Sequence, residues 1–153
     1  MSAIHREQWV PALLPVVFSF FSDAGNLDRI TPPWLRFSIL GQSEFVLSTG
    51  TLIHYRLAWY GIPVKWTSRI EEWLPPRRFV DVQLRGPYRR WHHIHTFEQR
   101  DGGTLIGDTV HYDLPMGAVG DFFAGWIVRR DVERIFDYRA EQISAIFKEH
   151  AEL

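Results

Sequence analysis

The sequence of 153 residues contains no cysteine, which excludes disulfide bonds, thiolate metal sites and cysteine nucleophiles. Its formal net charge is only -1, whereas a nucleic-acid-binding surface normally carries a basic excess, so we expect no nucleic-acid partner. The apolar runs at 13–21 and 118–128 are too short and too interrupted to span a bilayer, and residues 1–10 lack the apolar stretch of a signal peptide. We therefore expect a soluble, cytoplasmic protein without membrane insertion.

Two common catalytic signatures are also missing. No serine lies in a nucleophile-elbow context, and no glycine-rich phosphate-binding loop is present, so we expect neither a bound nucleotide nor a cofactor. Aromatic side chains, by contrast, are abundant at 15% of all residues. Large rings bury much area each, and they suit either a protein core or the wall of an apolar pocket.

The middle of the chain has the rhythm of strands and turns. A short helix is predicted at 14–21, and a second turn or helix at 27–30 ends at two prolines, which cannot continue it. After these, short segments rich in aromatic and β-branched residues alternate with Gly, Pro and Asp. They predict six strands, near 34–40, 51–60, 63–73, 78–85, 91–99 and 104–113. Their short connections favour an antiparallel meander.

The last part of the chain predicts one long helix, from Asp121 as N-cap to about Glu149. Its apolar stripe follows 3.6-residue spacing through Val128, Val132, Ile135, Phe136, Ile143, Ile146 and Phe147. No linker or repeat divides the chain, so residues 1–153 form a single domain. Sheet and helix each need a partner for their apolar face. We expect an α+β fold of the helix-grip type, in which a curved antiparallel sheet of six or seven strands wraps around the long C-terminal helix and leaves a pocket.

Several stretches of the chain carry a family resemblance. They are Val17-Phe18-Ser19-Phe20-Phe21-Ser22-Asp23-Ala24-Gly25-Asn26-Leu27, Thr31-Pro32-Pro33-Trp34-Leu35, Phe79-Val80-Asp81-Val82-Gln83, Gly86-Pro87-Tyr88, Trp91-His92-His93-Ile94-His95-Thr96-Phe97 and Asp108-Thr109-Val110-His111-Tyr112. In these the sequence resembles the START-like, SRPBCC or Bet v 1-like superfamily, and within it the bacterial polyketide cyclase/dehydrase-like group. The resemblance covers nearly the whole chain.

The resemblance implies a helix-grip fold with a ligand cavity but no defined reaction, because members bind lipids, sterols, polyketides or plant metabolites and only some are enzymes. Three functions remain open. The first is binding of a small hydrophobic ligand, such as a lipid, polyketide or aromatic metabolite. The second is a cyclase or dehydratase that uses His95 with Asp81 or Asp108. The third is a protein-interaction module with a vestigial pocket.

The turn between the last two predicted strands determines which of their polar residues stand opposite one another. Asp101-Gly102 is a favoured two-residue turn, and pairing of the residues that flank it predicts that His95 stands opposite Asp108. If the preceding hairpin pairs Arg85 with Trp91, Asp81 stands opposite His95 on the other side. We therefore predict a row of Asp81, His95 and Asp108 across three strands.

The predicted row has two interpretations. A histidine between two carboxylates is expected to have a raised pKa and to orient a polar ligand group or transfer protons. Alternatively, the three residues form a satisfied polar ladder on the sheet. His93 and His95 also have the spacing of metal ligands, with Asp81, Asp108 or His111 as a third, but no other histidine motif supports a metal site and we expect none.

The sheet face that carries two large aromatic rings, Trp91 and Phe97, is expected to face the interior. We predict that the ligand contacts Trp59, Trp66, Gln83, Trp91, His93, Phe97, Tyr112, Phe123, Trp126 and Ile127. The stretch 119–128 is apolar almost all round. Such a helix start is deeply buried, lines a cavity, or docks a protein partner, a second copy or a membrane surface.

Overall fold

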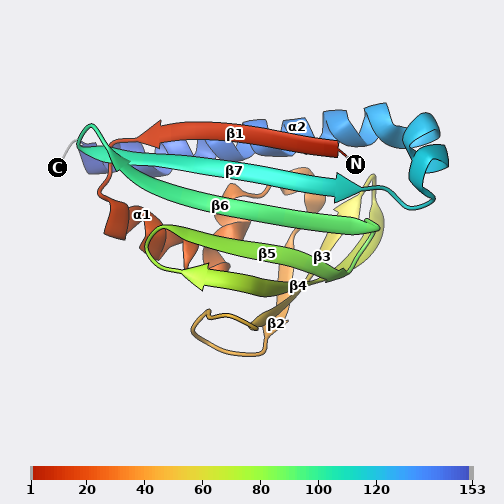
Figure 1. Ribbon diagram of the computed structural model, residues 1–153, viewed down its shortest axis with the longest axis horizontal. Coiled ribbons are helices and arrows are strands. Elements are labelled where there is room, and N and C mark those ends of the chain that lie inside the picture. The colour runs from red at the N-terminus through yellow and green to blue at the C-terminus, as the bar shows by residue number, and fades with distance from the viewer. Residues whose placement is uncertain (1, 152–153) are drawn as a thin grey trace.

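The computed structural model describes residues 2–151 and shows one strongly curved sheet with a long helix along it (Figure 1). In chain order the strands are β1 (Ser2–Val10), β2 (Ser38–Gln42), β3 (Leu52–Trp59), β4 (Ile62–Leu74), β5 (Arg78–Arg85), β6 (Arg90–Arg100) and β7 (Gly103–Asp113). They form one antiparallel sheet in the order β1-β7-β6-β5-β4-β3-β2. The predicted α+β helix-grip fold is confirmed, with seven strands.

The helices lie on one side of this sheet. They are α1 (Leu14–Phe21), the 3-10 helices η1 (Ala24–Ile30) and η2 (Pro33–Leu35), and α2 (Gly117–Ala151). Helix α2 runs behind the sheet along β1 and β7 (Figure 1). It begins at Gly117, earlier than the predicted Asp121, because the chain enters the helix through a tight turn at Met116 and Gly117, which both have positive φ. A Cβ on Gly120 would lie 2.1 Å from the carbonyl oxygen of Pro115, so only glycine fits this close approach.

Strand β1 was not predicted from the sequence. It pairs with β7 at one edge of the sheet, and its inward positions carry both apolar side chains, Ile4 and Val10, and polar ones, Arg6 and Gln8. Arg6 donates from Nη1 to Asp137 of α2 at 2.7 Å, and Gln8 donates from Nε2 to the carbonyl oxygen of Ala140 at 2.7 Å. These polar residues hydrogen-bond the helix at positions where apolar side chains would normally pack. The sequence therefore lacks the alternation of apolar and polar residues by which a half-buried strand is recognised.

The strand predicted near 34–40 is shorter than expected. Pro33 to Leu35 form the 3-10 turn η2, and Arg36 has a left-handed backbone with φ of 48° before β2 starts at Ser38. Prolines favour the φ of such a turn and lack the N–H that a strand ladder needs, which explains the difference.

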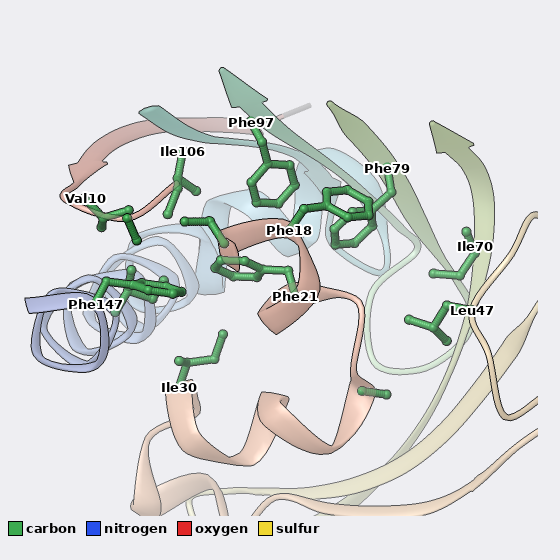
Figure 2. Packing of buried hydrophobic residues seen from close by; sticks show 14 of the residues in the cluster. Val10, Phe18, Phe21, Ile30, Leu47, Ile70, Phe79, Phe97, Ile106 and Phe147 are labelled. Carbon is green, nitrogen blue, oxygen red and sulfur yellow. The ribbon is translucent and has the colours of Figure 1, made fainter. Parts of the chain in front are cut away.

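Apolar side chains from both termini close one end of the molecule. Phe18 and Phe21 of α1 pack against Phe97 of β6, with ring centroids 5.3 and 5.2 Å apart, and Phe18 also contacts Phe79 (Figure 2). Phe147 of α2 is 1% exposed in the same cluster. This dense packing leaves the other end of the interior to the cavity described below.

The hairpin of β6 and β7 has the predicted register. Asp101 and Gly102 both have positive φ, as a type I′ turn requires, and Arg100 pairs with Gly103. His95 therefore stands opposite Asp108. Elsewhere β4 carries two register irregularities against β5, which are typical of bulges that bend a sheet. The bend turns the far half of the sheet toward α2.

Candidate functional site

A cavity of about 480 Å³ lies between the concave face of the sheet and α2. Its volume is in the range of small-molecule sites. The helix contributes an apolar stripe to one wall, consisting of Ala124, Val128, Val132, Ile135 and Phe136. The sheet and the short helices η1 and η2 supply the rest of the wall, which is also mainly apolar and aromatic.

Aromatic rings of β3, β4 and β6 line the sheet side of the cavity. Tyr55 and Trp66 stack with centroids 5.8 Å apart, and Trp91 meets Trp66 edge-on at 5.4 Å. The indole Nε1 of Trp66 donates to Ser68 Oγ at 2.9 Å, and the Tyr55 hydroxyl hydrogen-bonds the same oxygen at 3.1 Å. The polar atoms of both rings are thus hydrogen-bonded to Ser68, and these bonds hold the two ring planes in place along the cavity wall.

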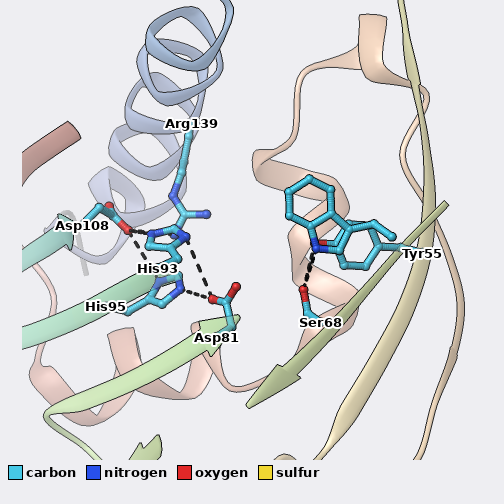
Figure 3. Close-up of polar contacts among 8 residues, drawn as sticks. Tyr55, Ser68, Asp81, His93, His95, Asp108 and Arg139 are labelled. Atoms are coloured by element: carbon cyan, nitrogen blue, oxygen red, sulfur yellow. Dashed lines mark hydrogen bonds and ion pairs between the residues drawn. The ribbon is translucent and has the colours of Figure 1, made fainter. Parts of the chain in front are cut away.

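One patch of the cavity wall is polar, and it contains Asp81 and His95 of the predicted row, whereas Asp108 lies beside them outside the wall (Figure 3). His95 donates from Nε2 to Asp81 Oδ2 at 2.6 Å, and His93 donates from Nε2 to Asp108 Oδ1 at 2.8 Å. The two imidazoles stack with centroids 3.7 Å apart. Arg139 reaches the same cluster from α2, with Nη2 at 3.5 Å from Asp108 Oδ1. Three strands and the helix therefore converge on one buried group of charges.

The pairing of Asp81 differs from the prediction by two residues. It stands opposite His93 in the ladder, and His95 stands opposite Phe79. The ladder stops at Val82 because the side chain of Gln83 closes the following loop on the backbone of Tyr88, at 2.7 and 3.1 Å. A shift of two keeps every side chain on its face, so Asp81 still reaches His95 diagonally.

The ionisation of the cluster is governed first by burial. Burial and the neighbouring His93 lower the pKa of His95 to about 4, although Asp81 and Asp108 act in the opposite direction. The raised pKa expected from the sequence is therefore wrong, because that argument counted the carboxylates but not the loss of water around a side chain that is 4% exposed. At neutral pH His95 is a neutral imidazole.

The two carboxylates respond in the other direction. Burial alone would raise the pKa of Asp81, but the hydrogen bond from His95 and the nearby positive charges lower it overall. Burial would likewise raise the pKa of Asp108, and the charge of Arg139 with the hydrogen bond from His93 lowers it well below its usual range. Both residues are therefore ionised at neutral pH.

The donor types of this cluster also permit metal binding. Asp81, His93 and His95 each offer a ligand atom, and these atoms lie within 4.8 Å of one another. However, Asp81 Oδ2 and His95 Nε2 are already joined by a short hydrogen bond, and the guanidinium of Arg139 adds a positive charge to the same cluster. The arrangement is that of hydrogen-bonded pairs, and it disfavours a divalent cation.

The structure divides the predicted ligand-binding residues into two groups. Trp59, Trp66, Trp91 and His93 line the cavity, and their contact with a ligand stays a prediction. Six others lie away from its wall: Gln83, Phe97, Tyr112, Phe123, Trp126 and Ile127. Gln83 closes the loop described above, whereas Phe97 and Tyr112 are buried in the two core clusters.

Phe123, Trp126 and Ile127 were predicted to line the cavity because they are large and apolar. That prediction did not consider which face of the helix each residue occupies. The stripe that faces the cavity runs back from Val132 through Val128 to Ala124. Phe123 and Trp126 point outward and are 72% and 65% exposed. This exposed patch fits the alternative of a partner or homodimer surface, which stays a prediction.

Sequence reasoning missed Arg139, Tyr55 and Ser68 as cavity residues. A signal for Arg139 existed, since it interrupts the buried apolar stripe of α2 between Phe136 and Ile143. A cation at such a position is buried only where it meets a partner.

Within residues 2–151, no helix is long and apolar enough to cross a membrane.

Comparison with known proteins gives a consistent assignment. A family model described as "Polyketide cyclase / dehydrase and lipid transport" matches residues 10–136. No curated protein sequence matches the chain significantly. The family match confirms the resemblance read from the sequence.

Solved structures share the fold. Protein Ms6760 from Mycobacterium smegmatis has a TM-score of 0.71 at 16% identity, over 97% of this chain and 92% of that one. Ara h 8.0201 has a TM-score of 0.69 at 16% identity, over 97% and 98%. A nucleoside-diphosphate sugar epimerase from Corynebacterium glutamicum is 26% identical and has a TM-score of 0.67. The match covers 95% of this chain but only 29% of the epimerase. The first two likenesses show the fold alone.

Proposed function

We propose, on the premise that the chain belongs to the polyketide cyclase/dehydrase and lipid-transport family, that it binds a small hydrophobic molecule between its sheet and α2. The observation that carries this proposal is the cavity of about 480 Å³ with its apolar, ring-lined wall. An interior filled by side chains would have favoured an interaction module with a vestigial pocket. A mainly apolar cavity of this size, with a few polar groups in its wall, is typical of a small-molecule binding site and supports the proposal.

The polar patch determines how such a ligand lies. Rings and aliphatic groups fit against Trp66, Trp91 and the helix stripe, and a polar group fits against His95 and Arg139. Ligand pockets commonly combine apolar walls with a few polar groups that fix orientation. The proposed ligand is therefore mainly apolar, flat over part of its length, and polar at one end.

The test compares two neighbouring residues of α2. Val128 lines the cavity, whereas Ile127 does not. Val128→Trp should reduce the affinity for the neutral dye N-phenyl-1-naphthylamine by about tenfold, or ~1.4 kcal/mol, because the indole occupies the space of the dye. Ile127→Trp should leave the affinity unchanged. Tryptophan quenching and dye emission measure binding, and native mass spectrometry of freshly purified protein identifies any co-purified molecule. Equal affinities of the two variants would refute binding in this cavity.

A second candidate function is proton transfer, as in a cyclase or dehydratase. The favouring observation is the hydrogen bond of 2.6 Å from His95 to Asp81 at the cavity wall, with the imidazole neutral at neutral pH. A neutral imidazole held by a carboxylate is suited to act as a general base. The probe is 2-tetralone in D₂O, whose acidic C–H exchange is followed by NMR. Wild type should accelerate exchange relative to His95→Gln, and equal rates would exclude this function.

A further inference from the structure

Arg139 is a buried cation with two donor atoms, Nε and Nη2, that make no hydrogen bond within residues 2–151. The residue is 9% exposed, and its guanidinium lies against the rings of Phe21 and Phe136, with Cζ to centroid distances of 5.4 and 5.9 Å. Asp108 approaches Nη2 at 3.5 Å without forming a hydrogen bond. Among residues 2–151, neither Nε nor Nη2 has a hydrogen-bond partner. Arg139 also lines the cavity.

The two unsatisfied atoms belong to one edge of the guanidinium. Their N–H bonds point in the same direction and match the two oxygens of a carboxylate in a bidentate pair. Arginine keeps its charge at all relevant pH values, and a buried cation without full pairing is costly. Both atoms are fully buried, so the flexible side chain must turn about its terminal bonds to present this edge to an acceptor in the cavity that Arg139 lines.

Both carboxylates of the cluster are already hydrogen-bonded to a histidine. Asp81 accepts from His95 and Asp108 accepts from His93, at 2.6 and 2.8 Å. These hydrogen bonds hold both carboxylates against imidazoles, so Arg139 is the donor that remains for a ligand. The Nδ1 of His95, which also lacks a hydrogen-bond partner in the described chain, lies 3.5 Å from Asp108 Oδ1.

We propose that the cavity selects apolar molecules that carry a carboxylate, and that Nε and Nη2 of Arg139 donate to its two oxygens. This inference rests on the proposed ligand-binding function and adds the chemical class of the ligand. A neutral ligand that presents a single carbonyl or hydroxyl oxygen is the competing outcome, and the experiment distinguishes the two.

The test uses two probes with the same apolar body, 2-naphthoate and 2-naphthylmethanol, at pH 7. Wild type should bind the carboxylate more tightly, on the order of tenfold to a hundredfold, because it forms two charge-assisted hydrogen bonds. Arg139→Met keeps the apolar stem and should abolish this preference while still binding the alcohol. Arg139→Lys should keep only part of it, because an ammonium lacks the paired donors. Tryptophan quenching and calorimetry measure the affinities.

The matched control is Arg134→Met on the exposed side of the same helix, which should retain the wild-type preference. Equal affinity of wild type for the two probes, or tighter binding of the alcohol, would overturn the inference and leave the proposed function intact. Retention of the preference in folded Arg139→Met would also overturn it. Binding of neither probe by wild type would overturn both the inference and the proposed function.

Discussion

Acidification should destabilise the protein through His95 well before the carboxylates titrate. The folded-state pKa of about 4 lies below the ordinary value of 6.5, because burial and His93 outweigh the attraction of Asp81 and Asp108. Between these values the unfolded chain binds a proton at this position and the folded chain does not. Stability therefore rises with pH across this window, and it falls as the pH is lowered from about 6.5 to 4. Asp81 and Asp108 have lowered pKa values, so their contribution is lost only at lower pH.

The size of the effect follows from the shift in the pKa of His95. A shift from 6.5 to about 4, at 1.36 kcal/mol per pH unit, sets a limit of about 3 kcal/mol for complete protonation of the unfolded chain. Between pH 7.5 and pH 5 the linkage relation gives a loss of about 2 kcal/mol. A loss of this size is a substantial part of the stability of a domain.

Two variants isolate this contribution. His95→Gln keeps an N–H donor for Asp81 but cannot titrate, so its loss of stability between pH 7.5 and pH 5 should be smaller than that of wild type by about 2 kcal/mol. His5→Gln removes an exposed histidine, with 61% of its side chain accessible, and should follow the wild-type curve. Urea denaturation at a series of pH values measures both, and an NMR titration of the imidazole reports its pKa directly. A pKa of His95 above 6.5, or parallel curves for wild type and His95→Gln, would refute this reasoning.

Three further changes test the assignment of core, edge and surface. Phe97→Ala should lower the free energy of unfolding by about 3–5 kcal/mol in urea denaturation, because a core ring is lost, and a loss under 1 kcal/mol would contradict its burial. Gly103→Ala should weaken the pairing of β1 with β7, since a Cβ would lie 2.2 Å from the carbonyl oxygen of Val10. Faster amide exchange in β1 would report this, and unchanged exchange would argue against it. Replacing Phe123 and Trp126 together by Ser should change stability by less than about 1 kcal/mol. If their patch joins two copies, light scattering should show a wild-type dimer and a variant monomer, whereas a monomeric wild type would exclude the homodimer.

The parts of the fold that local chemistry determines could be predicted from the sequence. The Asp101-Gly102 turn predicted the register of β6 against β7, and with it the position of His95 opposite Asp108. The apolar stripe of α2 predicted the buried face that carries Val132 and Phe136. In each case the signal lies within a few residues and needs no knowledge of distant partners.

The parts that depend on distant partners could not be predicted. The inward polar residues of β1 make sense only once α2 is seen to accept their hydrogen bonds. The stop of the β5–β6 ladder at Val82 depends on how the Gln83 amide folds back on Tyr88. The pKa of His95 depends on its burial, which the strand pattern alone does not reveal.

The polar cluster is hard to explain by stability alone. Replacement of a buried charge network by apolar residues of similar volume is often neutral or stabilising, because desolvation offsets the attraction between the charges. Here Asp81, Asp108 and Arg139 are brought together from two strands and a helix, although the surrounding wall is apolar. In addition, one edge of Arg139 makes no hydrogen bond to any residue of the described chain. A network built only for stability would pair the two buried donors of that edge, whereas a network that binds a ligand leaves them unpaired until the ligand arrives, and this difference favours a role in binding.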